Sequence, residues 1–95
     1  MLRIESLEID DQVLDKIEVK HHIKFEEVEE ICLCEQRHIR RAMEGLYKVF
    51  GQTASGGRYI LVVLADKGGG DWKVATARLM TDTEKRLYKK AIGGK

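Results

Sequence analysis

The longest apolar run in the chain covers residues 58–65, is rich in β-branched residues and has glycines on both sides. This composition is typical of a strand that is buried on both faces. Residues 46–53 and 72–80 are predicted to form strands on either side of it, because glycine-containing turns separate the three segments. The simplest arrangement is an antiparallel meander with residues 58–65 in the middle.

Helical periodicity appears before and after these strands. Asp10 and Asp11 are good N-caps for a helix over residues 11–20. A capping box, Thr81 to Glu84, predicts a last helix over residues 82–91. Between them a second helix is indicated by four residues that fall on one helical face: Phe25, Val28, Ile31 and Cys32.

The remaining segments complete an α+β domain. Residues 2–9 alternate loosely and give a weak strand signal, and residues 36–44 are predicted as a polar strand. The three glycines at 68–70 lack the lysine and helix of a phosphate-binding loop and fit a hairpin tip. We therefore expect one domain, residues 1–95. It would hold a small antiparallel sheet of about four strands, two N-terminal helices and one C-terminal helix.

Alternation along residues 72–80 assigns side chains to the two faces of that strand. One face would be mostly apolar and would include an arginine; its members are Trp72, Val74, Thr76, Arg78 and Met80. An arginine on a mostly apolar strand face is a better candidate for a specific role than a charged residue on the surface.

Composition limits the class of protein. Charged residues make up 35% of the chain, and no apolar run approaches the ~20 residues of a membrane span. The N-terminus lacks an export signal, so we expect a cytoplasmic protein without a membrane partner. Cys32 and Cys34 are too close for an ordinary disulfide and too few for a zinc site, so both are predicted to be free thiols. No metal or cofactor site is predicted.

The net charge of +1 conceals an asymmetry. Residues 1–35 hold four basic and eleven acidic residues, and residues 36–95 hold thirteen basic and five acidic ones. A basic region of this kind is expected to bind a polyanion or an acidic partner. The alternative is that the two parts of the chain attract each other within the fold.

The order of short motifs resembles the BrnT family of toxins from type II toxin–antitoxin systems. Lys20-His21 precedes a Phe-Glu-Glu-Val segment at Phe25, and a further signature near the end is met by Ala77, Arg78, Thr81, Glu84 and Tyr88. The resemblance covers about residues 13–90. His22 and Lys24 depart from the family pattern, which indicates a divergent branch.

The resemblance implies a RelE-like fold, a metal-independent endoribonuclease that needs no cofactor, and a cognate antitoxin that neutralises it. Such a hydrolase uses the substrate's 2′-hydroxyl and needs a base, an acid and positive charge at the phosphate. His21 is then the acid or base, and Arg58 and Arg78 are the catalytic phosphate-binding residues. The alternatives are a helix-ending surface histidine, a sheet-edge arginine, and an arginine paired with a glutamate of the N-terminal part.

Further basic residues are expected to bind the RNA phosphates: Lys20, Arg40, Arg41 and Arg86. His38, Arg40 and Arg41 could equally belong to a solvated edge strand. A second function fits the same scaffold, namely a non-enzymatic domain that binds a protein or forms a homo-oligomer. RNA binding without cleavage is less favoured, because aromatic residues make up only 6% of the chain and offer little stacking surface.

Overall fold

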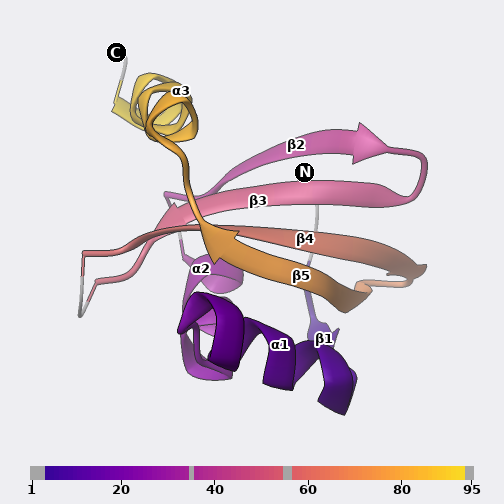
Figure 1. Cartoon of the computed structure of the whole chain (residues 1–95). Helices are drawn as coiled ribbons and strands as arrows, with labels where there is room; N and C mark the ends of the chain where they lie inside the picture. The colour runs from indigo at the N-terminus through magenta and orange to yellow at the C-terminus, as the bar shows by residue number, and fades with distance from the viewer. Residues whose placement is uncertain (1–3, 35, 55–56, 94–95) are drawn as a thin grey trace.

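A computed structural model describes residues 4–34, 36–54 and 57–93. A sheet lies between two unequal helical layers, with α1 and α2 on one side and α3 on the other (Figure 1). In chain order, the elements are β1 (Ser6–Glu8), α1 (Asp11–His21), α2 (Phe25–Leu33), β2 (His38–Met43), β3 (Leu46–Gln52), β4 (Tyr59–Gly68), β5 (Asp71–Leu79) and α3 (Asp82–Gly93).

The strand order is β1-β5-β4-β3-β2, which confirms the apolar run as the central strand. Strands β2 to β5 form the predicted antiparallel meander. The predicted count of about four strands is one short, because β1 adds to the edge of β5, and it does so in parallel. β1 pairs through only three residues with a strand about 65 positions away, so local alternation carried little information about it.

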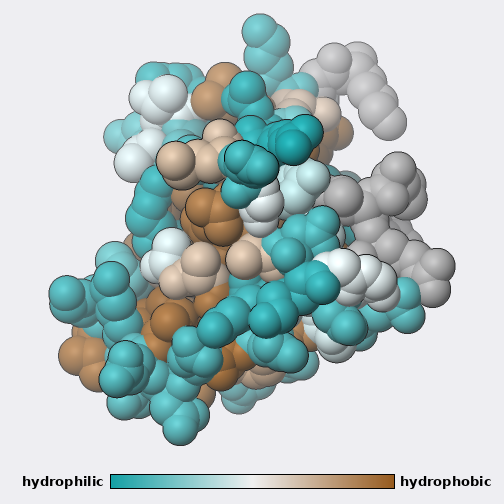
Figure 2. Space-filling model, turned by 90° about the vertical axis from the view of Figure 1, so that its right-hand side faces the viewer, coloured by the Kyte–Doolittle hydropathy of each residue, from teal (hydrophilic) through white to brown (hydrophobic). Residues whose placement is uncertain are grey.

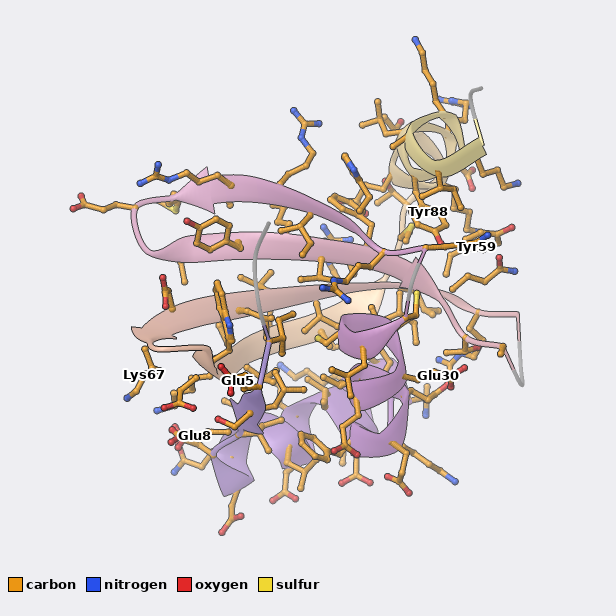
Figure 3. All side chains as sticks on the ribbon, turned by 180° about the vertical axis from the view of Figure 1, so that it is seen from behind. Glu5, Glu8, Glu30, Tyr59, Lys67 and Tyr88 are labelled. Atoms are coloured by element: carbon orange, nitrogen blue, oxygen red, sulfur yellow. The ribbon has the colours of Figure 1, made fainter. Side chains whose placement is uncertain are left out.

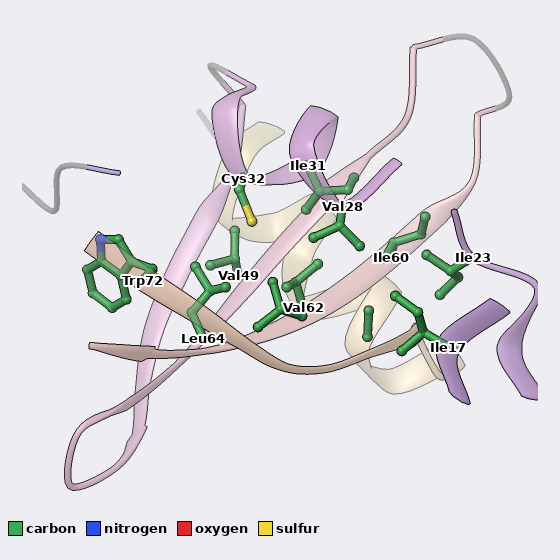
Figure 4. Packing of buried hydrophobic residues seen from close by; sticks show 12 residues of the cluster. Ile17, Ile23, Val28, Ile31, Cys32, Val49, Ile60, Val62, Leu64 and Trp72 are labelled. Carbon is green, nitrogen blue, oxygen red and sulfur yellow. The ribbon is translucent and has the colours of Figure 1, made fainter. Parts of the chain in front are cut away.

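The main core fills the space between the sheet and the helix pair (Figure 4). It includes Ile17 of α1, Val28 and Ile31 of α2, and Val62 of β4, each fully buried. Gly51 of β3 lets α2 approach the sheet, because a Cβ at this position would lie 3.0 Å from Ile31 Cγ2. The apolar face of each N-terminal helix therefore packs against this side of the sheet.

β5 contains an irregularity that reassigns its faces. Leu64 aligns with Val74, but Val63 aligns with Thr76, so Ala75 is an extra residue in the strand. Trp72 and Val74 consequently share the main core with Ala77, and Thr76 and Arg78 project to the opposite face. The predicted grouping of Arg78 with Trp72 and Val74 was wrong, because strict alternation does not survive a bulge.

A smaller core lies under α3, where Phe50, Leu61, Met80 and Tyr88 are buried together. The predicted capping box is confirmed: the Thr81 amide donates to Glu84 Oε1, and the Glu84 amide donates to Thr81 Oγ1. Tyr88 is the buried residue of α3, and its hydroxyl donates to the Gln36 carbonyl at 3.0 Å. α3 is thus fixed over one end of the sheet.

The two cysteines are free thiols, as predicted. Cys32 points into the main core, and burial raises its thiol pKa to about 12. The three glycines at 68–70 all have positive φ in the β4–β5 hairpin, which confirms the hairpin tip. Within the described ranges, no helix is long and apolar enough to cross a membrane. On the side of the molecule with the hairpin tips, most visible hydrophobic atoms gather in the lower half, which holds α1 (Figure 2).

Candidate functional site

Arg58 joins the start of β4 to the loop between α1 and α2. Its guanidinium Nη1 donates to both carboxylate oxygens of Glu27 at 3.1 Å and to the His22 carbonyl at 2.9 Å. His22 has a φ of 56°, a left-handed conformation that ends α1 and turns its carbonyl toward Arg58. Arg58 therefore clamps this loop, and its partner is an N-terminal glutamate.

Arg78 makes a bidentate ion pair at the other end of the chain. Its Nη1 and Nη2 donate to the two carboxylate oxygens of Glu84 at 2.7 and 2.8 Å. The hydrogen bonds from Arg78 lower the Glu84 pKa to about 2, so this carboxylate stays ionised and oriented. The predicted alternative partner in the N-terminal part was wrong for Arg78, because the bulge turns its side chain toward α3.

The sheet separates the two arginines. Arg58 is bonded to α2 on one side, and Arg78 is bonded to α3 on the other. His21 is the last residue of α1, next to the His22 carbonyl that Arg58 binds. The structure thus brings His21 and Arg58 into one region and places Arg78 in another.

The sheet surface around Arg78 carries several basic residues, and we call it the α3-side face. The strand register defines it as two rows across the sheet. One row is His38, Phe50, Leu61 and Arg78; the next is Arg40, Lys48, Val63 and Thr76. Phe50 and Leu61 are buried under α3, whereas Arg40 is exposed. The second row is therefore a shallow surface with cations at its β2–β3 end.

His38 is the histidine of this face. Its ring lies 5.9 Å from that of Phe50, measured between centroids. Partial burial, followed by the nearby Arg40 charge, lowers the His38 pKa below its ordinary value of 6.5. A neutral imidazole at pH 7 is the form that accepts a proton.

The other predicted RNA-binding residues are dispersed. Arg41 aligns with Tyr47, whose ring contacts Trp72 of the main core, so Arg41 projects to the face opposite Arg40. Lys20 is exposed near the end of α1, and Arg86 is exposed on α3 with Nη2 3.4 Å from Thr83 Oγ1. Of the four predicted positions, the structure brings Arg40 to the face that holds Arg78.

Two further residues, Lys48 and Tyr59, were not predicted as site residues from the sequence. Lys48 shares strand alternation with Phe50, a signal that was visible in the sequence. Tyr59 lies beside Tyr88 beneath α3 (Figure 3), with their ring centroids 6.1 Å apart. A pocket of about 370 Å³ opens next to it, lined by Gly57, Arg58, Tyr59, Leu79, Met80 and Lys85. Only the folded arrangement of β4 and α3 reveals this pocket.

Among the described residues, no group of three or more His, Cys, Asp or Glu side chains could hold a metal ion. The ionised groups on the α3-side face are mainly cations, which suit phosphate oxygens. The charge of this face is therefore complementary to that of a phosphodiester.

Comparisons with known proteins agree at the level of fold. No family model and no curated protein matches the sequence. The structure is similar to the crystal structure of the Brucella abortus ribonuclease toxin BrnT, with a TM-score of 0.66. The alignment covers 81% of this chain and 97% of that chain, at 14% sequence identity. The chain thus has a BrnT-like α+β fold, which confirms the resemblance to BrnT at the level of fold.

Proposed function

We propose that this chain is a toxin-like endoribonuclease that cleaves RNA without a metal ion and is neutralised in the cytoplasm by a cognate antitoxin. The observation that carries the proposal is a BrnT-like fold with a basic face beside Arg78. The structural neighbour is a ribonuclease toxin by its title. A fold alone does not determine an activity, so the proposal also depends on the residues of this face and their chemistry.

RNA phosphates would bind across the α3-side face. His38 and Arg78 lie in one row, three strand spacings or about 14 Å apart at the backbone. Arg78 uses three hydrogen bonds on Glu84 and the Leu79 carbonyl, which leaves further guanidinium N–H groups for a phosphate. Glu84 holds the guanidinium in place, so its ordering does not have to occur at the moment of reaction.

Arg40 and Lys48 would extend the phosphate-binding path. They are directly cross-strand neighbours, and among the described residues neither has a carboxylate partner. Adjacent like charges are unfavourable in a sheet unless an anion lies over them. An RNA backbone supplies such anions.

Proton transfer has two candidates on opposite sides of the sheet. His38 shares the face of Arg78 and has the lowered pKa of a base. His21 precedes His22, whose carbonyl Arg58 binds, and a rival site would combine His21 with Arg58 as the phosphate-binding residue. We favour His38 with Arg78, because these two residues share their sheet face with the further cations Arg40 and Lys48. Lys20, Arg41 and Arg86 would guide RNA from the periphery.

Induced expression in bacteria tests the function. The wild-type chain should arrest growth with loss of RNA, and Arg78→Ala should relieve the arrest while the protein stays folded. Lys90→Ala is the control, because it removes one exposed cation from the neighbouring helix at a position with no assigned role in RNA binding. Normal growth with a soluble, folded wild-type chain would refute the toxin proposal.

A non-enzymatic interaction domain is the second candidate. The observation that favours it is the edge position of β2, whose outer side has no neighbouring strand among the described residues. Such an edge can accept a strand from a partner or from another copy of the chain. This candidate would be favoured if the folded wild-type chain binds a protein partner or another copy of itself but leaves RNA intact.

A further inference from the structure

Two lysines of α3 converge on one aromatic ring. Lys85 Nζ lies 5.7 Å and Lys89 Nζ 5.1 Å from the centroid of the Tyr59 ring. The two lysines are four residues apart, so they project from the same side of the helix. The ring itself is held from another direction by its edge contact with Tyr88. The position of the ring is therefore fixed, whereas the lysine side chains are flexible.

The charge of this cluster is not compensated within the part of the chain that the structure describes. No carboxylate there forms an ion pair with Lys85 or Lys89. Glu84, the nearest acidic residue in sequence to Lys85, is engaged by Arg78. Like charges four residues apart on a helix repel each other. An anion placed between the two ammonium groups would remove this repulsion.

The adjoining pocket supplies the second half of a nucleotide site. Its volume of about 370 Å³ lies in the range of small-molecule sites. Its lining combines the aromatic residue Tyr59 and the apolar residues Leu79 and Met80 with two cations, Arg58 and Lys85. An aromatic surface beside a cation is the arrangement that binds a base and its phosphate in single-stranded nucleic acid.

We propose that Tyr59, Lys85 and Lys89 bind one nucleotide of a single-stranded RNA. The base stacks at Tyr59 in the pocket, and the two lysines bind the flanking phosphates. Arg78 adjoins this site, because it is bonded to Glu84, the residue before Lys85. The nucleotide therefore lies next to the phosphodiester that Arg78 binds. This inference rests on the proposed function, and it assigns α3 the task of fixing the strand.

Binding of an uncleavable RNA tests the site separately from catalysis. The probe is a short fluorescein-labelled single-stranded RNA whose 2′-hydroxyls are methylated. Its Kd is measured by anisotropy over a series of salt concentrations. Lys85→Ala/Lys89→Ala should reduce the steepness of log Kd against log[salt] by about 1.4, since each phosphate contact on a single strand contributes about 0.7. The control Lys16→Ala/Lys90→Ala removes the same charge from two exposed positions and should change the slope less.

Tyr59 is tested by a pair of variants. Tyr59→Phe keeps the ring and should bind like the wild type, whereas Tyr59→Leu should bind roughly tenfold more weakly because stacking is lost. Thermal unfolding shows whether each variant folds. If Tyr59→Leu does not fold, the salt slopes of the two lysine double variants are the test. Equal slopes for the two lysine double variants would overturn the site. If RNA cleavage by the wild type persists in that case, only this inference fails; if the wild type neither binds nor cleaves RNA, the proposed function fails with it.

Discussion

The Arg78 guanidinium donates to both carboxylate oxygens of Glu84, while Oε1 of the same carboxylate accepts the Thr81 amide. One glutamate thus caps the N-terminus of α3 and orients the arginine at the end of β5. The strand, the helix and the candidate phosphate-binding group are connected by this one side chain. Changes at Glu84 should therefore affect both stability and RNA cleavage.

Glu84→Gln should destabilise the fold by about 1 kcal/mol at pH 7, because glutamine retains part of the cap but loses the ion pair. The Glu84 pKa is lowered from 4.5 to about 2 in the folded chain, chiefly by the Arg78 hydrogen bonds. A lowered carboxylate pKa stabilises the fold above pH 4.5, and this contribution disappears as the pH falls toward 2. Urea unfolding of the wild type and Glu84→Gln across that range should show that their free energies of unfolding converge as the pH falls. A difference that stays constant would contradict the ion pair.

Arg58→Ala should destabilise the fold by about 1–2 kcal/mol, because it removes the ion pair with Glu27 and the hydrogen bond to the His22 carbonyl. Arg40→Ala, which removes an exposed arginine, should change stability by less than about 0.5 kcal/mol. Urea unfolding at neutral pH measures both variants. Equal stability of the two would mean that the Arg58 clamp does not form in solution.

Gly51→Ala should cost about 1–3 kcal/mol, because the new methyl group meets Ile31 side-chain carbons at 3.0 and 3.1 Å, and the buried Ile31 must move to make room for it. Gly93→Ala is the matched control, since a Cβ there meets nothing within 4 Å. Thermal or urea unfolding compares the two. A Gly51→Ala protein as stable as the control would show that α2 does not approach β3 so closely.

RNA cleavage should depend on pH through His38 if this residue is the base. Its pKa is lowered by partial burial first and by the Arg40 charge second. The rate should rise as His38 loses its proton, with a midpoint below 6.5, and then level off. Arg40→Ala should move that midpoint to higher pH, because one cause of the lowered pKa is removed. An unchanged profile in His38→Ala would exclude this residue and return the role to His21.

The sequence predicted most elements of the fold, because periodicity is a local property. The three helices and the four meander strands are explained by apolar spacing and caps. β1 escaped a firm prediction, because its pairing with β5 joins distant segments through three residues. The bulge at Ala75 escaped as well, since one additional residue leaves no mark on the composition of a strand.

The candidate site was harder to predict than the fold. Motif order identified Arg58 and Arg78 as basic residues of interest but not their partners, Glu27 and Glu84. The separation of the two arginines by the sheet depends on the bulge and on which helix covers which face. The cluster around Tyr59 needs α3 docked on β4, a contact between segments about 26 residues apart.

The proposed function requires that the chain cleave RNA at Arg78 on the α3-side face. Purified antitoxin-free protein should be incubated with RNA in EDTA, with wild type, Arg78→Ala and Arg58→Ala in parallel, and the products resolved by length. We predict cleavage by the wild type, at least about a hundredfold loss in Arg78→Ala as for other groups that stabilise developing charge, and retained cleavage in folded Arg58→Ala. Intact RNA with the folded wild type would contradict the proposed function, and undiminished cleavage by Arg78→Ala would contradict the role of Arg78.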